Sequence, residues 1–292
     1  MLKPSFVPLR LYSEYSIESS IIRIKDAVSY AKSQNFPALA LSDRMNMFAA
    51  VKFYNACRRE GIKPLFALDI FMQARDGEDK SSLLLLAKDY QGYLQLCELL
   101  TEAYLQSENT EAASVSWQAL TKLTGGHLIC LSGAAQGLVG YYFIKGKKDK
   151  ARALACELNA IFQDNFYLEI QRWVDVSLPG VDESNQRAMQ RLQKNIEINL
   201  HGSLALAKEL DLPLVATHPI EFLNPEDFLA HEVKVCITQG GVLEDPQRPH
   251  SFYPGQYFLS ADVMEALFAD IPSALINAGE IAKRCTVDLK LY

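Results

Sequence analysis

The sequence predicts an α/β protein built as a distorted seven-stranded (β/α) barrel with a mostly helical C-terminal extension. Three observations support this: short apolar runs alternate with amphipathic stretches, these runs carry few polar residues on either face, and about seven such units follow one another. With 292 residues, 49% of them hydrophobic, the chain can bury a sizeable core. We expect the barrel to span 1–224 and the helical extension to span 225–292.

Hydrophobic spacing justifies the elements in order. The run "SFVPLRL" predicts a strand, and Ile21, Ile24, Val28 and Ala31 then recur at the spacing of one helix face. The next helix, "NMFAAVKFYNACRRE", is expected to end at Gly61, because glycine readily adopts the left-handed conformation at a helix C-terminus. Strands are expected at 5–11, 37–42, 63–73, 81–87, 127–132, 165–170 and 212–218. Further helices are expected at 89–104, 148–161 and about 183–210.

The charge balance argues against a broad nucleic-acid-binding face. The formal net charge is −6 and the pI is near 5.5, whereas phosphate binding requires clustered lysine and arginine. The best candidate for a local basic patch is "KGKKDKAR" at 145–152. A solvated helix start or loop is the simpler explanation of this run, since charge runs usually face solvent.

Cysteine usage and hydropathy both favour a cytoplasmic protein. The N-terminus lacks the basic region and apolar core of a signal peptide, and no apolar run approaches the roughly 18 to 20 residues that span a bilayer. The cysteines occur singly, without a C-x-x-C pair, and we expect all of them to be reduced and buried. They are Cys57, Cys97, Cys130, Cys156, Cys236 and Cys285.

The carboxyl ends of the predicted strands are where a barrel builds its active site. The residues expected there are Arg10, Tyr12, Asp43, Arg44, Asp69, 132–134, 169–171 and 217–221. His218 is the only histidine among them, whereas a hydrolytic metal site needs several carboxylates and imidazoles that converge. His127, His201, His231 and His250 are interpreted as structural or surface residues, because none has a second ligand at i+2 or i+4.

Ordered motifs along nearly the whole chain resemble a known family. They include "FVPLRLYSEYS", "PALALSDRMNMFAAVKFYNACRREGIKPLFALD", "LICLSGAAQG", "LPLVATH", "LEDPQRP" and "LFADIPSALINAGEIAKRC". Together they resemble the N-terminal PHP (polymerase and histidinol phosphatase) domains of bacterial replicative DNA polymerase III alpha subunits. The resemblance implies a distorted seven-stranded barrel. In that family the polymerase palm lies beyond the region that this chain matches.

The resemblance also implies where a trinuclear metal site would lie. The family's first-strand His-x-His falls on Arg10 and Tyr12, and the histidine of its T-D-H falls on Arg44. All nine ligand positions fall on Arg10, Tyr12, Ser19, Arg44, Asp69, Ser82, Ala134, Pro219 and Glu221. Only Asp69 and Glu221 could still bind a cation, which is too few for a four-ligand zinc site unless His218 or Asp43 is recruited. We therefore predict a vestigial site without metal or catalytic residues.

Two explanations of the replaced ligands remain open. Arg10 and Arg44 could pair with Asp69 and Glu221 and fill the former metal cavity as an ion-pair cluster, because carboxylates left buried without cations are costly. Alternatively, the cavity is simply packed and the arginines are incidental.

Two functions follow from the resemblance. The first is a non-catalytic scaffold, inactive by itself, that supports the rest of the alpha subunit in DNA replication and binds the proofreading exonuclease subunit, with at most weak direct DNA contact. The alternative is a manganese- or zinc-dependent phosphoesterase or 3′-5′ exonuclease, which the loss of ligands disfavours. Trp117 and Trp173 are candidate partner anchors, and each could equally be a packing residue.

Overall fold

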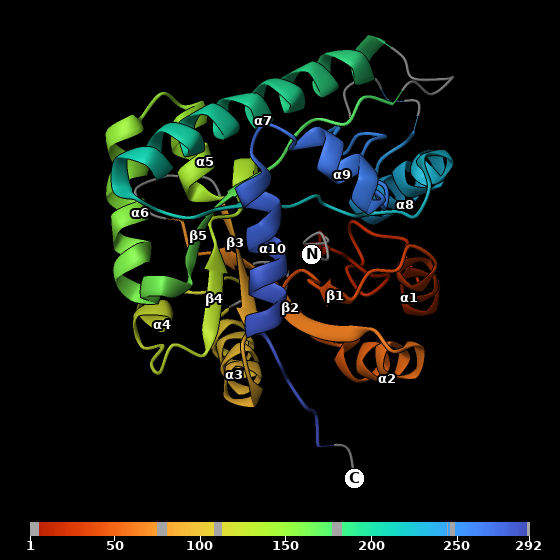
Figure 1. The fold of residues 1–292 in the computed structure, drawn as a ribbon. Helices are drawn as coiled ribbons and strands as arrows, with labels where there is room; N and C mark the ends of the chain where they lie inside the picture. The colour runs from red at the N-terminus through yellow and green to blue at the C-terminus, as the bar shows by residue number, and fades with distance from the viewer. Residues whose placement is uncertain are drawn as a thin grey trace.

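A computed structural model describes residues 6–74, 81–107, 113–176, 183–243, 245 and 249–290 (Figure 1). Its centre is one six-stranded sheet in the order β1-β2-β3-β4-β5-β6. The strands are β1 (Ala38–Leu41), β2 (Lys63–Met72), β3 (Ser81–Ala87), β4 (Leu128–Leu131), β5 (Phe166–Ile170) and β6 (Leu214–Ala216). Each lies within a range that the apolar runs predict.

The sheet is mixed. β1 pairs with β2, β4 with β5 and β5 with β6 in parallel, whereas β3 is antiparallel to both β2 and β4. The (β/α) barrel that the sequence predicts has a mainly parallel sheet, and this expectation is wrong around β3. Only eight residues, 73–80, join β2 to β3, and so short a connection can join antiparallel neighbours but cannot cross back to a parallel one.

The first strand that the sequence predicts, 5–11, does not form a regular strand in the structure from Phe6 onward. Pro8 O and Leu11 O accept hydrogen bonds from Ala40 N (3.0 Å) and Ser42 N (2.8 Å), which places this segment beside β1. On its other side, Tyr12 N donates to Ile220 O at 3.1 Å, and Ile220 N donates to Arg10 O at 3.1 Å. The described residues thus form a six-stranded half-barrel, where the sequence predicts seven strands.

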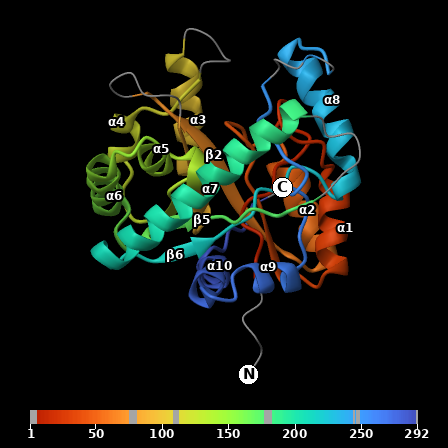
Figure 2. The same ribbon diagram turned by 90° about the horizontal axis from the view of Figure 1, so that it is seen from above.

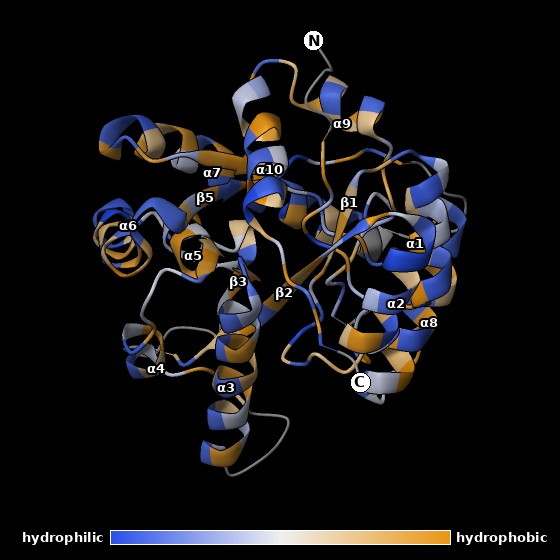
Figure 3. Ribbon diagram, turned by 60° about the horizontal axis from the view of Figure 1, so that its bottom comes forward, coloured by the Kyte–Doolittle hydropathy of each residue, from blue (hydrophilic) through white to orange (hydrophobic). Residues whose placement is uncertain are grey.

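Helices surround the sheet (Figures 1 and 2). They are α1 (Ile24–Ser33), α2 (Ala50–Glu60), α3 (Tyr90–Gln106), α4 (Trp117–Thr121), α5 (Leu138–Ile144), α6 (Lys148–Phe162), α7 (Glu183–Leu210), α8 (Phe228–Gln239), α9 (Ala261–Leu267) and α10 (Pro272–Arg284). Gly61 ends α2 with φ 71°, and the Asp89 side chain caps α3 by accepting a hydrogen bond from Gly92 N. Figure 3 shows hydrophilic and hydrophobic segments mixed along these helices, as amphipathic helices require.

The C-terminal helix α10 packs against β6. Asn277 Nδ2 donates to Leu214 O at 2.7 Å, and Lys63 Nζ at the start of β2 donates to Ala282 O at 2.8 Å. The division into 1–224 and 225–292 stays a prediction. Among the helices of the described residues, none has both the length and the hydropathy needed to cross a bilayer.

The cysteines only partly follow the expectation. All six are free, and Cys57, Cys130, Cys236 and Cys285 are buried, but Cys97 is half-buried and Cys156 is exposed. Cys156 faces solvent because α6 turns Ala151, Leu154, Ala155, Leu158 and Phe162 toward the core.

Candidate functional site: a buried ion-pair cluster

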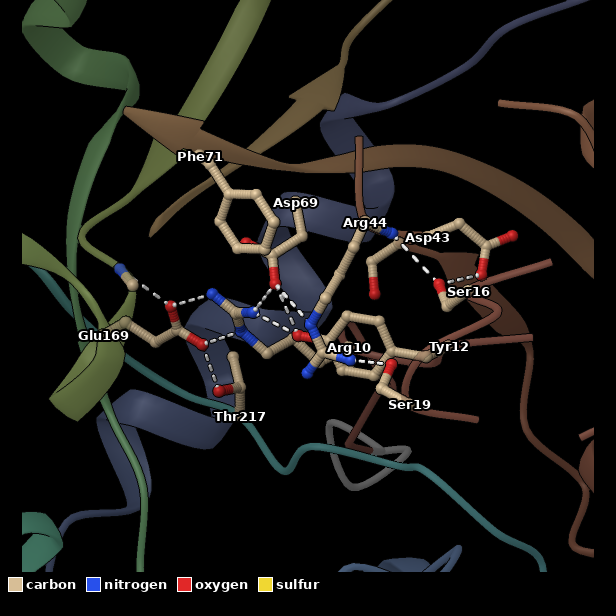
Figure 4. Close-up of polar contacts among 12 residues, drawn as sticks. Arg10, Tyr12, Ser16, Ser19, Asp43, Arg44, Asp69, Phe71, Glu169 and Thr217 are labelled. Atoms are coloured by element: carbon tan, nitrogen blue, oxygen red, sulfur yellow. Dashed lines mark hydrogen bonds and ion pairs between the residues drawn. The ribbon is translucent and has the colours of Figure 1, made fainter. Parts of the chain in front are cut away.

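A buried polar cluster lies where the sheet's carboxyl ends meet the N-terminal segment. Its charged members come from five places in the chain: Arg10, Arg44 just after β1, Asp69 in β2, Glu169 in β5 and Glu221 after β6. All except Arg44 are at most 2% exposed, and the Arg44 side chain is 15% exposed. Figure 4 shows Arg10 between Asp69 and Glu169.

Arg10 bridges two carboxylates. Its Nε and Nη2 donate to Glu169 Oε1 (2.6 Å) and Oε2 (3.0 Å), which is the bidentate geometry that suits a guanidinium. Its Nη1 donates to Asp69 Oδ2 at 2.9 Å and to the Tyr12 hydroxyl at 2.5 Å. Burial opposes the charge on Arg10, but the negative charges of Glu169 and Asp69 outweigh it and hold the pKa of Arg10 above its ordinary value.

Arg44 makes the second half of the cluster. Its Nη2 donates to Glu221 Oε1 at 2.7 Å, Nη1 donates to the Ser19 hydroxyl, and Nε lies 3.9 Å from Asp69 Oδ2. The guanidinium carbon lies 3.9 Å from the centroid of the Tyr12 ring, a cation–π contact.

Tyr12 joins the two halves. Its hydroxyl donates to Asp69 Oδ2 at 2.7 Å, between the two guanidinium groups that approach the same carboxylate. Burial raises the pKa of Tyr12 above its ordinary value, so the phenol stays neutral.

Glu169 is the charged member that the sequence-based hypothesis does not include. Besides Arg10, its carboxylate accepts hydrogen bonds from Gly133 N at 3.1 Å and from the Thr217 hydroxyl. A lone glutamate inside the apolar strand run "FYLEI" is the cue that could have identified it, because a buried carboxylate requires a partner.

Asp43 belongs to a separate hydrogen-bonding loop. Its carboxylate accepts from Ser13 N and the Ser13 hydroxyl, both at 2.7 Å, and from the Ser16 hydroxyl at 2.8 Å. Burial nevertheless raises its pKa above the ordinary value. Both carboxylate oxygens of Asp43 accept hydrogen bonds from serines, so Asp43 stabilises the loop that leads to Ser19 and is not available as a metal ligand.

The remaining positions where the resemblance places ligands carry little that could hold a cation. Ala134 and Pro219 are buried and lack side-chain donor atoms for a metal, and Ser82 is buried with no hydrogen-bond partner for its hydroxyl. His218 is turned away, with Nε2 at 3.0 Å from Tyr257 O. Asp69 Oδ1 is likewise buried without a hydrogen-bond partner.

The residues present do not fit a metal centre. Each of the three carboxylates already accepts a hydrogen bond from Arg10 or Arg44, and two guanidinium charges would repel a divalent ion placed among them. The three carboxylates and two guanidinium groups of the cluster carry one excess negative charge when all are ionised. Burial raises the pKa of the Glu221 carboxyl above its ordinary value, although the nearby positive charge of Arg44 acts in the opposite direction. Within the part of the chain that the structure describes, no group of three or more His, Cys, Asp or Glu side chains is placed to hold a metal ion.

The two tryptophans pack against the protein. The Trp173 ring stacks on Tyr253 with centroids 3.9 Å apart, and Trp117 packs against the main core while its Nε1 donates to Gln73 O at 3.2 Å. Neither contact identifies a partner-binding surface.

The fold and the polar cluster at the strand ends now have a class: the chain belongs to the PHP domain family, because that family's model matches residues 8–173. The chain is 43% identical over 293 residues to DNA polymerase III subunit alpha of Neisseria meningitidis serogroup B, covering 100% of this chain and 24% of that protein. It is 39% identical to DNA polymerase III subunit alpha of Pseudomonas fluorescens, covering 98% and 23% of the two chains. The chain thus spans about a quarter of the length of these curated relatives.

The comparison with solved structures gives weaker similarities. One is a two-domain protein of Bacteroides vulgatus described as containing a predicted PHP-like metal-dependent phosphoesterase. It is 10% identical, with a TM-score of 0.35, and the match covers 66% of this chain and 49% of that one.

Two buried histidines beside the cluster are expected to make the stability of the protein depend on pH. Burial lowers the pKa of His218 and of His231 to about 4, whereas both protonate near pH 6.5 in an unfolded chain. Between these values the unfolded state binds more protons, so this contribution is complete above pH 6.5 and is lost as the pH falls toward 4. We expect the free energy of unfolding to fall by about 1.4 kcal/mol per pH unit for each histidine across this window.

Urea unfolding at pH 7, 6 and 5 measures this slope. His231→Phe, which keeps a ring between Phe222 and Phe252, should reduce the slope, and His201→Phe at an exposed position should leave it unchanged. Equal slopes in all three proteins would contradict the assignment.

Proposed function

We propose that this chain acts as a non-catalytic PHP domain, in the cytoplasm, that supports the rest of a replicative DNA polymerase III alpha subunit during DNA replication and binds its proofreading exonuclease subunit. One observation carries the non-catalytic part: Arg10 and Arg44 occupy the carboxylates at the strand ends. The relatives' name supports the assignment to the alpha subunit.

The same contacts support the further proposal that this is a vestigial metal site. Arg10, Tyr12 and Arg44 stand where the resemblance places imidazole ligands, and each now donates to, or packs against, a neighbour in the cluster. We further propose that residues 8–12 serve as the seventh strand of a distorted barrel, since their backbone bonds to both neighbouring segments.

The experiment is a measurement of metal content by mass spectrometry on protein purified without chelator, together with phosphatase and 3′-5′ exonuclease assays in added Mn²⁺. We expect no stoichiometric metal and no turnover, because each cluster carboxylate is already paired with a guanidinium. An active metal-dependent phosphoesterase is assayed in parallel as a positive control. One bound equivalent with Mn²⁺-dependent hydrolysis would establish the enzyme alternative instead.

The partner part of the proposal has a separate readout in the same preparation. The immobilised 292-residue chain should retain the purified proofreading exonuclease subunit in a pull-down, with an unrelated protein of similar net charge as the control. Failure of this pull-down alone would remove the docking role and leave the non-catalytic assignment intact.

A further inference from the structure

The basic stretch 145–152 is a strongly charged segment that the proposed function leaves unexplained. Four lysines and one arginine against a single aspartate give it a net charge of +4, in a chain whose formal net charge is −6. Positive potential is therefore concentrated in one short segment of an otherwise acidic protein.

The structure presents these charges to solvent. The segment forms the turn after α5 and the first turn of α6, and its five basic side chains are all exposed. Lys145 Nζ lies 5.5 Å from the centroid of the Tyr141 ring, and Lys150 Nζ lies 5.6 Å from that of Tyr142. Arg152 Nε pairs with Glu209 Oε1 at 2.5 Å across the surface, where both side chains are about half exposed.

A groove of about 730 Å³ runs beside this segment, between α6 and α7. Apolar atoms of Phe143, Ile198 and Leu206 contribute to its lining. Basic residues from both helices line it as well: Lys148, Arg152, Lys194 and His201. Asp149, Glu197 and Glu209 also line it, so the groove itself is close to neutral and the excess positive charge lies in the turn at its end.

We propose that this surface binds single-stranded DNA, with phosphates on the lysines of 145–152 and unstacked bases in the groove. Clustered exposed lysines attract the regularly spaced phosphates, and apolar or aromatic surface next to them accommodates bases whose faces are free. A duplex keeps its bases stacked and would leave the apolar lining unused, and a polyanion without apolar groups would leave it unused as well. The proposal rests on the proposed function only for the choice of DNA over RNA.

Fluorescence anisotropy with a labelled oligothymidylate tests the proposal. The patch variant is Lys147→Glu, Lys148→Glu and Lys150→Glu, and the control is Lys25→Glu, Lys122→Glu and Lys283→Glu at exposed positions elsewhere. Each variant changes the formal net charge from −6 to −12. The control also loses the exposed pairs of Lys122 with Glu102 and of Lys283 with Glu280, which contribute little to stability. Glutamates in the first turn of α6 favour the helix, which keeps the patch variant folded.

We expect the patch variant to bind the oligonucleotide at least about tenfold more weakly than the control at 50 mM salt. In a plot of the logarithm of the binding constant against the logarithm of salt concentration, the slope for the patch variant should be shallower by about 2, because each lost phosphate contact contributes roughly 0.7. Duplex DNA of equal length and polyglutamate serve as competing ligands. The proposal is overturned if wild type does not bind, if the two variants bind alike, or if either competitor binds as tightly as the single strand. The assay needs neither metal nor exonuclease subunit. A negative result would therefore overturn DNA binding at this surface and leave the proposed function intact.

Discussion

Replacing Arg10 with methionine is expected to lower the free energy of unfolding by about 3–5 kcal/mol, because it leaves Asp69 and Glu169 buried without their cation. Methionine keeps much of the side-chain volume, so the loss reflects charge and hydrogen bonding more than a cavity. Urea-induced unfolding followed by circular dichroism measures the change.

Arg152→Met is the matched control for this experiment. Arg152 also makes a close ion pair, with Glu209, but on the surface, where such pairs contribute little, so its unfolding midpoint should not move. The triple variant Arg10→Met, Asp69→Asn, Glu169→Gln should recover part of the lost stability, because it also removes the two carboxylate charges that Arg10→Met leaves without a cation. If Arg10→Met is no less stable than Arg152→Met, the cluster does not contribute to stability.

Gly133→Ala should cost a comparable amount, about 4 kcal/mol, through backbone strain and overlap together. Gly133 has φ 85°, in the left-handed region, and an added Cβ would overlap Ser82 O and lie 2.7 Å from Gly137 Cα. Both neighbours are backbone atoms that cannot swing away. The substitution would also disturb the hydrogen bond from Gly133 N to Glu169.

Gly146→Ala separates these two causes. Gly146 has φ 69° but no atom within 4 Å of an added Cβ, so only the conformational strain of about 1 kcal/mol applies. Thermal or urea unfolding of the two variants gives the comparison. Equal losses would show that the close packing at Gly133 is not what requires glycine there.

The elements could be predicted from the sequence because their causes are local. The runs "PALALS" and "SSLLLLA" are apolar on both faces and became β1 and β3, and the face formed by Ile24, Val28 and Ala31 is buried in α1. The apolar pattern of β3 does not reveal its antiparallel orientation, although the short connection 73–80 does indicate it. The strand count differs because residues 8–12 bond to their neighbours too irregularly to be assigned.

The cluster could be predicted only in part. Charged residues at the ends of apolar strands indicate which side chains lie near one another. The pairing of each guanidinium with a particular carboxylate depends on distances between strands that are far apart in the sequence. Arg10 and Glu169 are 159 residues apart, and no local pattern relates them. The structure adds Glu169 and Thr217 and keeps Asp43 outside the cluster, bonded to Ser13 and Ser16.

Arg10, Tyr12 and Arg44 all approach the same carboxylate, that of Asp69, and this limits which substitutions the sequence can accept during evolution. Residues in one hydrogen-bonded network have non-additive effects on stability, so the cost of altering one depends on the state of the others. A single arginine-to-histidine change at position 10 would remove a cation from two buried carboxylates before any other ligand existed to hold a metal. Metal binding at these positions would therefore need several substitutions, and the first of them would lower the stability of the protein.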